Sequence, residues 1–519
     1  MSTNARFVVP GRPMNLAQVF LFDRLAEGRA DQRALIVDTP DGVTTYTYGE
    51  IAALSAQYGH ALAERGLGLE DRVFIILEDG AEWVAAFFGA LAIGCTVMFL
   101  NPKVGDEEIA FYLADSRAKG VVTTAEIAAH LPTERPYLRA VHTVDTDVSA
   151  HPTTIKVAST LEEDFAIWLY SSGSTGAPKA AVHRAYDFVY NTERYAKDVL
   201  QITDQDVTLS VPKLFFGYAT GSNLLFPFYF GGAAILFPDR PTPERLFDMA
   251  ERHGATVLIN VPTMIAQMAA HHAAAENKPK TDTLRLLTSA GEALPPDLYQ
   301  RWMNEVGVEI LDGIGSAEMF HVFISARLGE VRPGSLGTIV EGYEAKIVDA
   351  DGKEVEVGEM GALHIKGHSS AAFYWQRHEK SRTTLQGEWV VTSDQFIRDA
   401  DGYYWFKGRA DDVLKVAGRW LSPQEIEDAL TRHEAVLEAG AAAYQDDGLN
   451  KPMAFVILRE GFTADDALKK ALSQHVADTL APYKAPRFIE VVDALPRGDR
   501  DKLDRKALAT LAAEAASRR

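Results

Sequence analysis

Tyr170-Ser-Ser-Gly-Ser-Thr-Gly-Ala-Pro-Lys179 is the stretch on which the interpretation of this chain depends. It follows an apolar, strand-like run, Phe165-Ala-Ile-Trp-Leu169. Gly173 and Gly176 permit tight turns and close approach of a ligand to the backbone, and successive amides in such a loop form a nest for anions. Lys179 adds a positive charge. Further hydroxyl ligands for phosphate oxygens come from Ser171, Ser172, Ser174 and Thr175.

This loop therefore predicts a polyphosphate site. It is not a Walker A loop, which has four residues between its glycines and ends in Gly-Lys-Ser/Thr. The alternative is a flexible surface linker rich in serine and glycine. A linker is disfavoured because the loop comes directly after a buried strand and ends in Pro-Lys.

Apolar runs of strand length alternate with helical stretches on both sides of the loop. Strands are expected at 73–77, 120–124, 257–260 and 284–289, and a helix at 82–94. Such alternation predicts an α/β fold with mixed, largely parallel sheets flanked by helices. From about residue 330, short β runs with turns at 349–352 and 399–402 predict a small, β-barrel-like subdomain.

A separate C-terminal region with an α+β pattern is expected from residue 411. Helices are expected at 425–432 and 467–480 and a strand at 453–458, while the end from Leu511 to Arg519 is expected to fray. The predicted domains are 1–410 and 411–519. A length of 519 residues with 47% hydrophobic residues fits more than one buried core.

Charge and cysteine content exclude several classes of protein. The formal net charge is −20 (52 basic against 72 acidic residues), which argues against nonspecific nucleic-acid binding. The single cysteine, Cys95, excludes an internal disulfide and a cysteine-based zinc site, and it is expected to be a buried apolar residue.

The termini and apolar runs favour a cytoplasmic protein that does not enter the membrane. The first residues lead into no apolar signal core. The uncharged run from Trp83 to Leu100 reaches the lower length limit of a membrane span. Gly89, Gly94 and the following Asn101-Pro102 favour instead a buried helix that leads into a core strand.

Five further motifs in the same order make the chain resemble the adenylate-forming enzymes, the superfamily of acyl-CoA synthetases, luciferases and nonribosomal adenylation domains. The loop matches their phosphate-binding loop. The other matches are Gly291-Glu-Ala-Leu-Pro295, Asp312-Gly-Ile-Gly-Ser-Ala-Glu318, Thr392-Ser-Asp394, Gly408-Arg-Ala-Asp-Asp-Val-Leu-Lys415 and Lys502 six residues after Pro496. The resemblance covers nearly the whole chain.

The resemblance implies a two-step reaction with ATP, Mg²⁺ and coenzyme A. The carboxylic acid is first adenylated with release of pyrophosphate, and the acyl group then passes to CoA with release of AMP. It implies catalytic roles for Lys502 and Glu318, with Glu318 also linked to magnesium. The residues that the resemblance assigns to ATP or AMP are Ser171, Ser172, Gly173, Ser174, Thr175, Gly176, Lys179, Gly291, Glu292, Ala293, Asp312, Asp394 and Arg409.

The C-terminal domain is implied to be mobile and to rotate between the two half-reactions. Asp411 matches the hinge position, and Gly418 falls where the pantetheine arm of CoA would pass. Two residues depart from the family pattern: Ala317 stands where threonine is usual, and Asp501 where glycine usually precedes the catalytic lysine. The first half-reaction is therefore expected to survive but to be slower.

Three segments resemble those of benzoate-CoA ligases in particular: 212–221, 237–243 and 313–322. The second of these, 237–243, lies outside the implied pocket. By this resemblance the acyl pocket is lined by Gly217, Tyr218, Gly315, His321 and Val322. Glycines leave room for a flat ring and aromatic side chains pack against it, and the small residues predict space for a ring substituent. Phe215 and Phe216 fit either the pocket or the core.

The predicted function is an AMP-forming benzoate-CoA ligase acting on benzoate or a substituted benzoate. One alternative is a stand-alone enzyme that loads an aryl acid onto a carrier protein, and another is a non-catalytic protein that has lost an ancestral activity. Acetylation of Lys502 by a lysine acetyltransferase would remove a charge needed for adenylation. The sequence leaves a homodimer open.

Overall fold

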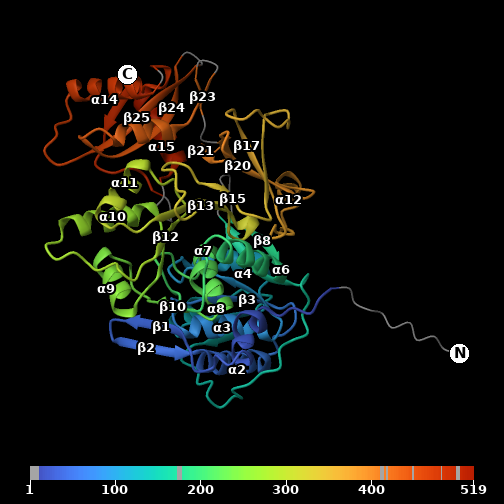
Figure 1. Ribbon diagram of the computed structural model, residues 1–519. Coiled ribbons are helices and arrows are strands. Elements are labelled where there is room, and N and C mark those ends of the chain that lie inside the picture. Colours follow the sequence, from blue (N-terminus) through green and yellow to red (C-terminus); the bar gives the residue numbers. More distant parts are fainter. Residues whose placement is uncertain are drawn as a thin grey trace.

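The computed structural model describes residues 11–171, 178–409, 414–416, 419–446, 449–480, 482–497 and 503–518. Figure 1 shows two large sheets with their helices at one end of the molecule and the C-terminal residues gathered at the other. Several predicted site residues lie outside the described residues: Ser172, Gly173, Ser174, Thr175, Gly176, Asp411, Gly418, Asp501 and Lys502.

The largest sheet has nine strands in the order β15-β14-β13-β12-β11-β9-β10-β1-β2. Its six central strands pair in parallel, and the strands at both edges pair antiparallel. The strands are β1 (Arg33–Thr39), β2 (Gly42–Thr47), β9 (Val207–Ser210), β10 (Ala233–Leu236), β11 (Val257–Asn260), β12 (Leu286–Ser289), β13 (Ile310–Gly315), β14 (Val322–Ser325) and β15 (Thr338–Ile339).

A second sheet has seven strands in the order β18-β8-β7-β4-β3-β5-β6. β7, β4, β3, β5 and β6 pair in parallel, whereas β8 and β18 complete the edge antiparallel. The strands are β3 (Arg72–Ile76), β4 (Thr96–Phe99), β5 (Gly120–Thr123), β6 (Ala140–Thr143), β7 (Phe165–Ser171), β8 (Lys179–Arg184) and β18 (Phe373–Tyr374). The predicted α/β fold with mixed, largely parallel sheets is confirmed.

The interior strands of both large sheets are buried on both faces, which explains their continuous apolar runs. In β3, Ile75 faces the cluster between the two sheets, while Phe74 and Ile76 face the opposite side. Helices α2 and α3 pack on each other; α2 contacts β1 and β2 at one edge of the nine-stranded sheet, and α3 contacts the interior strands β3 and β4 of the seven-stranded sheet. The helices of this part are α1 (Asp23–Ala26), α2 (Tyr48–Glu64), α3 (Ala81–Ala92), α4 (Asp106–Ser116), α5 (Ala125–His130), α6 (Ala185–Asn191), α7 (Gly217–Thr220), α8 (Phe226–Phe230), α9 (Pro243–His253), α10 (Pro262–Ala274), α11 (Pro296–Glu305) and α12 (His378–Thr384).

The run from Trp83 to Leu100 folds as predicted, into α3 and then β4, both buried. Cys95 lies between them and is buried, as expected. Among the described residues, no helix is long and apolar enough to cross a membrane.

The predicted β-rich subdomain is an antiparallel sheet of five strands. Asp349 and Asp399 each form the predicted turns, where their carboxylates accept hydrogen bonds from backbone N–H groups two and four residues ahead. The strands are β16 (Glu344–Val348), β17 (Met360–Lys366), β19 (Leu385–Gln386), β20 (Trp389–Arg398) and β21 (Tyr404–Arg409).

The C-terminal region forms an α+β unit with its own cores. α13 and α14 cover one face of the sheet β24-β25-β26, and α15 covers the other. Its elements are β22 (Leu414–Val416), β23 (Arg419–Leu421), α13 (Pro423–Thr431), β24 (Val436–Asp446), β25 (Leu449–Leu458), α14 (Asp466–Thr479), β26 (Phe488–Val491) and α15 (Arg505–Ser517). The expectation that the chain frays from Leu511 is wrong up to Ser517, because Leu508, Ala512 and Ala515 bury one face of α15.

Candidate active site

The predicted phosphate-binding loop is flanked by two antiparallel strands of the second sheet. β7 ends at Ser171 and β8 begins at Lys179, and these two residues are paired in the register. The Lys179 side chain is therefore fixed at the edge where the predicted loop lies. This arrangement is the one expected from the sequence, in which a buried strand leads directly into the loop.

Lys179 and Glu318 lie together although 139 positions separate them in the chain. Lys179 Nζ is 3.2 Å from Glu318 Oε1, and 15% of each side chain is exposed. Tyr374 completes the cluster: Lys179 Nζ donates to its hydroxyl at 2.6 Å, and the hydroxyl donates to Glu318. Lys179 Nζ also lies 4.0 Å from the centre of the Tyr374 ring. The cluster thus joins a cation, a carboxylate and a phenol.

Burial and charge pairing act in opposite directions on this cluster. Burial raises the pKa of Glu318, but the charge of Lys179 and the hydrogen bond from Tyr374 outweigh it and hold that pKa below its usual value. Burial lowers the pKa of Lys179, and the charge of Glu318 opposes the shift. The positive charges of Lys380 and Arg409 lower it further. The site therefore combines one ionised carboxylate, in contact with Lys179, with the further positive charges of Lys380 and Arg409 that act on Lys179, a composition suited to a polyphosphate and a cation.

Asp394 and Arg409, both predicted to bind ATP or AMP, lie directly opposite each other on β20 and β21. Asp394 N donates to the hydroxyl of Thr392, which in turn donates to the carbonyl of Leu363. The loop containing Gly291, Glu292 and Ala293 follows the end of β12, and Asp312 lies on the neighbouring strand β13. The structure thus brings these two predicted segments together at the carboxyl ends of adjacent strands.

Asp312 is buried, and no positively charged group contributes to the shift of its pKa. Burial raises the pKa of Asp312 to about 7, opposed by the Ser289 hydroxyl and by backbone N–H groups. Its environment therefore differs sharply from that of Glu318, six residues later.

The predicted acyl pocket surrounds His321. Its Nε2 lies 3.0 Å from the carbonyl of Tyr218 and therefore donates to it, and the Tyr218 hydroxyl lies 2.7 Å from that of Thr288. The rings of Tyr195, Tyr218 and Phe226 pack around the imidazole. Burial lowers the pKa of His321 to about 4, so this side chain is neutral near pH 7.

The remaining pocket residues are small where the backbone requires it. A Cβ at Gly315 would lie 2.5 Å from the carbonyl oxygen of His321, so only glycine fits between β13 and β14 there. Gly217 begins α7 and packs against Leu169 of β7. Val322 is buried at the start of β14. Phe215 and Phe216 pack on each other and are only partly buried.

A tight turn connects the charged cluster to the pocket. Phe320 has φ 67° and ψ −55°, and the N–H of His321 donates to the carbonyl of Met319 at 2.8 Å. These values describe a γ-turn of the rare, strained kind. Such strain in a residue with a side chain persists only where the surrounding structure fixes it, and it clusters at functional sites. Glu318 and His321 therefore face different parts of one site although two residues separate them.

His183 fixes the other end of this turn. It is fully buried; its Nδ1 lies 2.9 Å from a carboxylate oxygen of Asp187 and its Nε2 lies 2.7 Å from the carbonyl of Ala317. β8 thus carries Lys179 at its first residue and, four residues on, the contact that holds the residue before Glu318.

Sequence reasoning missed Tyr374, Lys380 and His183. Tyr374 lies in the two-residue strand β18, which pairs with β8. A strand of two residues is too short to produce a periodic pattern in the sequence. His183 could have been noticed as a lone histidine in the apolar run that follows Lys179.

Comparison with known proteins agrees with this geometry. Residues 22–375 match the model of the AMP-binding enzyme family, and residues 425–502 match that of the AMP-binding enzyme C-terminal domain. This chain belongs to the AMP-binding enzyme family. It is 40% identical to the benzoate–CoA ligase of Thauera aromatica over 510 residues, which covers 95% of both chains.

Two solved structures are similar over almost the whole chain. The anthranilate CoA ligase AuaEII, in complex with anthranoyl-AMP, has a TM-score of 0.89 and 36% identity, covering 98% of this chain and 99% of that one. A benzoate CoA ligase from Burkholderia xenovorans has a TM-score of 0.86 and 37% identity, covering 96% and 100%. The predicted resemblance to adenylate-forming enzymes, and to benzoate-CoA ligases among them, is confirmed.

Proposed function

We propose that this protein is an ATP-dependent ligase that joins an aromatic carboxylic acid, benzoate or a substituted benzoate, to CoA with formation of AMP. The observation that carries the proposal is the γ-turn at Phe320, which connects the cationic cluster around Glu318 to the aromatic pocket around His321. Relatives that cover the chain at 36–40% identity include benzoate–CoA and anthranilate–CoA ligases. Loading of a carrier protein is not favoured.

In the first half-reaction, a carboxylate oxygen of the acid forms a bond to the α-phosphorus of ATP, and the bond to pyrophosphate breaks. Negative charge develops on phosphate oxygens, so fixed cations and donors stabilise the transition state. Lys179, Lys380 and Arg409 supply positive charge at the described part of the site. The thiol sulfur of CoA then bonds to the acyl carbon, loses its proton and displaces AMP.

The aromatic ring of the acid would lie against Tyr218 and the neutral imidazole of His321. An imidazole kept neutral by burial adds no charge that would compete for the carboxylate, so the acid is oriented with its carboxylate toward the cations. Tyr218 is held from both ends, by Thr288 at its hydroxyl and by His321 at its carbonyl.

We infer a role for Mg²⁺ from the chemistry of Glu318. Mg²⁺ in nucleotide sites is bound by one or two carboxylates together with phosphates and water. Glu318 fits this requirement because its lowered pKa keeps it ionised. Among the described residues no group of three or more acidic, histidine or cysteine side chains gathers for a metal, at Glu318 or elsewhere. The ion would act as a Lewis acid on the phosphates.

The assignments outside the described residues complete the proposal. Lys502 would bridge the acid and the α-phosphate, Asp411 would be the hinge between domains 1–410 and 411–519, and Gly418 would leave space for pantetheine. Acetylation of Lys502 would silence adenylation by removing its charge. Adenylation that is unchanged in Lys502→Ala would remove this lysine from the mechanism.

A panel of aromatic and aliphatic acids, assayed for AMP release with and without CoA, tests the proposed function. We expect benzoate-type acids to give AMP release that depends on CoA and on Mg²⁺. Activation of aliphatic acids alone would contradict the aromatic assignment, and pyrophosphate release without any thioester would contradict the ligase. In Glu318→Gln, the Mg²⁺ concentration for half-maximal rate is expected to rise; an unchanged Mg²⁺ requirement would contradict the metal assignment.

A further inference from the structure

Two oppositely charged side chains are buried where the two large sheets meet. Asp79, 5% exposed, lies in the loop between β3 of the seven-stranded sheet and α3. Lys213, 8% exposed, follows β9 of the nine-stranded sheet. Each charge acts on the other: burial raises the pKa of Asp79 and lowers that of Lys213, and the partner opposes each shift. Neither side chain belongs to the site described above.

Lys213 connects two of the three segments that resemble benzoate-CoA ligases. It belongs to segment 212–221, and its Nζ donates to the carbonyl of Phe237, the first residue of segment 237–243. The same Nζ lies 3.3 Å from the centre of the Phe237 ring. Segment 237–243 lies outside the predicted pocket, and this contact gives it a physical connection to the pocket.

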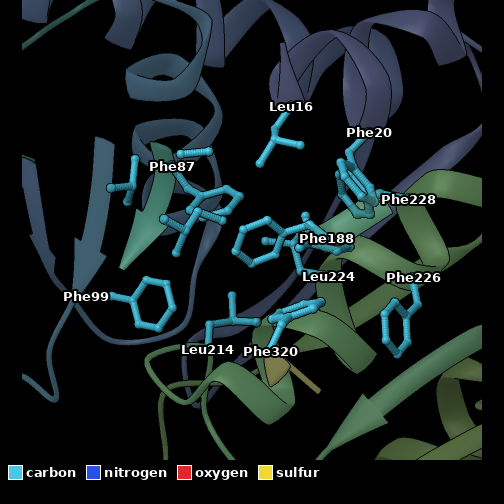
Figure 2. Packing of buried hydrophobic residues seen from close by; sticks show 14 of the residues in the cluster. Leu16, Phe20, Phe87, Phe99, Phe188, Leu214, Leu224, Phe226, Phe228 and Phe320 are labelled. Carbon is cyan, nitrogen blue, oxygen red and sulfur yellow. The ribbon is translucent and has the colours of Figure 1, made fainter. Parts of the chain in front are cut away.

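Asp79 fixes the residue next to Lys213. Its Oδ1 accepts a hydrogen bond from the N–H of Leu214 at 2.9 Å, and the carbonyl of Leu214 accepts one from the Thr220 hydroxyl at 2.6 Å. Leu214 is fully buried and points into the cluster that contains Phe188 and Phe320 (Figure 2). Both polar groups of its backbone and its side chain are thus fixed.

The fixed segment leads directly into the acyl pocket. The N–H of Phe216 donates to the carbonyl of Lys213 at 2.9 Å, and α7 then begins with Gly217 and Tyr218. Thr220, which holds Leu214, is the last residue of that helix. The position of Gly217 and Tyr218 therefore depends on contacts at three strand ends in two sheets.

Two buried opposite charges that act on each other without a direct contact are a weak source of stability, because the desolvation of both offsets their attraction. Well-packed apolar residues would stabilise the same place at least as well. The two side chains instead fix the position of the backbone, because the Lys213 ammonium and the Asp79 carboxylate make hydrogen bonds only with groups in fixed positions.

We propose that Asp79 and Lys213 are positioning residues for acid recognition, which hold the segment 213–218 so that Gly217 and Tyr218 form the wall of the aromatic pocket. This rests on the proposed aromatic-acid activity. It predicts that the pair acts on binding of the acid and leaves binding of ATP and CoA unchanged.

The test measures KM for benzoate, ATP and CoA separately in Lys213→Met, Asp79→Asn and the double variant, with thermal unfolding followed by circular dichroism. Lys213→Met is expected to raise KM for benzoate about tenfold or more, because small displacements of a positioning segment weaken binding strongly. KM for ATP and CoA is expected to stay within about twofold. Lys280→Met, in which the replaced lysine side chain is 70% exposed and pairs with Glu251, is the control and should change none of the three.

The double variant keeps the test decisive if either single variant folds poorly. It leaves no uncompensated buried charge, so it is expected to unfold at a higher temperature than either single variant and to lose less than the sum of their effects on KM for benzoate. Equal increases in all three KM values, or an unchanged KM for benzoate in folded variants, would overturn the proposal. Inactivity of the unmodified protein toward every aromatic acid would instead overturn the proposed function and the positioning role with it.

Discussion

The charged cluster at Glu318 and the acyl pocket at His321 are both withdrawn from water, yet burial has opposite outcomes in them. Glu318 stays ionised because Lys179 and Tyr374 contact it, and its pKa lies below the usual value. His321 has a ring environment and a backbone carbonyl instead of a charged partner, and its pKa falls to about 4. Asp312, with no cation among the groups that shift it, has a pKa raised to about 7.

The difference shows that a partner of opposite charge, and not the depth of burial, decides which groups carry charge in this site. A carboxylate activation site needs both outcomes. Cations must face the phosphates, while the wall that holds the ring must add no charge of its own. The γ-turn at Phe320 brings the two environments into contact over three residues.

Lys179→Met is expected to have the largest effect, because it removes the charged partner that distinguishes Glu318 from His321. The variant removes the partner of Glu318 and one cation from the phosphate site, so the carboxylate is left with burial of the kind that raises the pKa of Asp312. We expect pyrophosphate release to fall about 10²- to 10³-fold, the usual cost of losing one preorganised donor to a developing charge. Lys179→Arg keeps the charge and should lose less. Equal losses in both variants would show that charge is not what Lys179 contributes.

A further buried group, outside both regions, tests whether burial alone suffices to shift a pKa. His142 on β6 is fully buried and packs against Tyr58, and both its ring nitrogens lack a partner among the described residues. Burial lowers the pKa of His142 to about 4. The unfolded chain therefore binds a proton that the folded one does not between about pH 6.5 and 4, and stability falls as pH falls through this window.

His142→Phe keeps an aromatic contact and removes the titration. We expect the loss of stability between pH 6.5 and 4.5 to be smaller in this variant than in the unmodified protein, by up to about 2 kcal/mol. Urea unfolding at several pH values measures it. The control is His130→Phe, at a histidine whose side chain is 63% exposed. The same pH dependence in all three proteins would mean that His142 is protonated without cost.

Tyr374→Phe tests the contact between Lys179 and Glu318 with a smaller change. The ring remains beneath Lys179, but the hydroxyl that connects Lys179 to Glu318 is lost. One hydrogen bond to a charged group is worth about 1.5–3 kcal/mol. Since Lys179 and Glu318 still contact each other directly, we expect the low end, about a tenfold loss of pyrophosphate release. Tyr137→Phe, at an exposed tyrosine, is the control and should leave pyrophosphate release unchanged. Full activity of Tyr374→Phe would show that the hydroxyl does not contribute to pyrophosphate release.

Much of this site could be predicted from sequence because its motifs are local. Gly173 to Lys179, Asp312 to Glu318 and Asp394 are each marked by short patterns, and the α/β alternation predicts strand ends for the first two. The contacts between segments could not be predicted in the same way. Tyr374 reaches Glu318 through a two-residue strand, and Asp79 meets Leu214 across 135 positions. Such pairs depend on how two sheets pack, which no local pattern records.

The error at the C-terminus has a different cause. Leu508, Ala512 and Ala515 follow the spacing of one helical face, but two of them are alanines, whose small side chains give a weak apolar signal. In the structure they are buried against the sheet, and the helix continues to Ser517.

The smallest expected effect concerns Ala317, the residue whose carbonyl His183 fixes and whose side chain lacks the hydroxyl usual at this position. Ala317→Thr places a hydroxyl beside Glu318 and adds one donor for phosphate oxygens, worth about 0.5–1.5 kcal/mol. We expect pyrophosphate release to rise by a factor of about 2 to 10, measured in single turnovers with benzoate. Ala317→Val adds nearly the same volume without the hydroxyl and should give no increase. If both variants slow the reaction equally, the space beside Glu318 is already filled, and the γ-turn at Phe320 fixes Ala317 too tightly for a larger side chain.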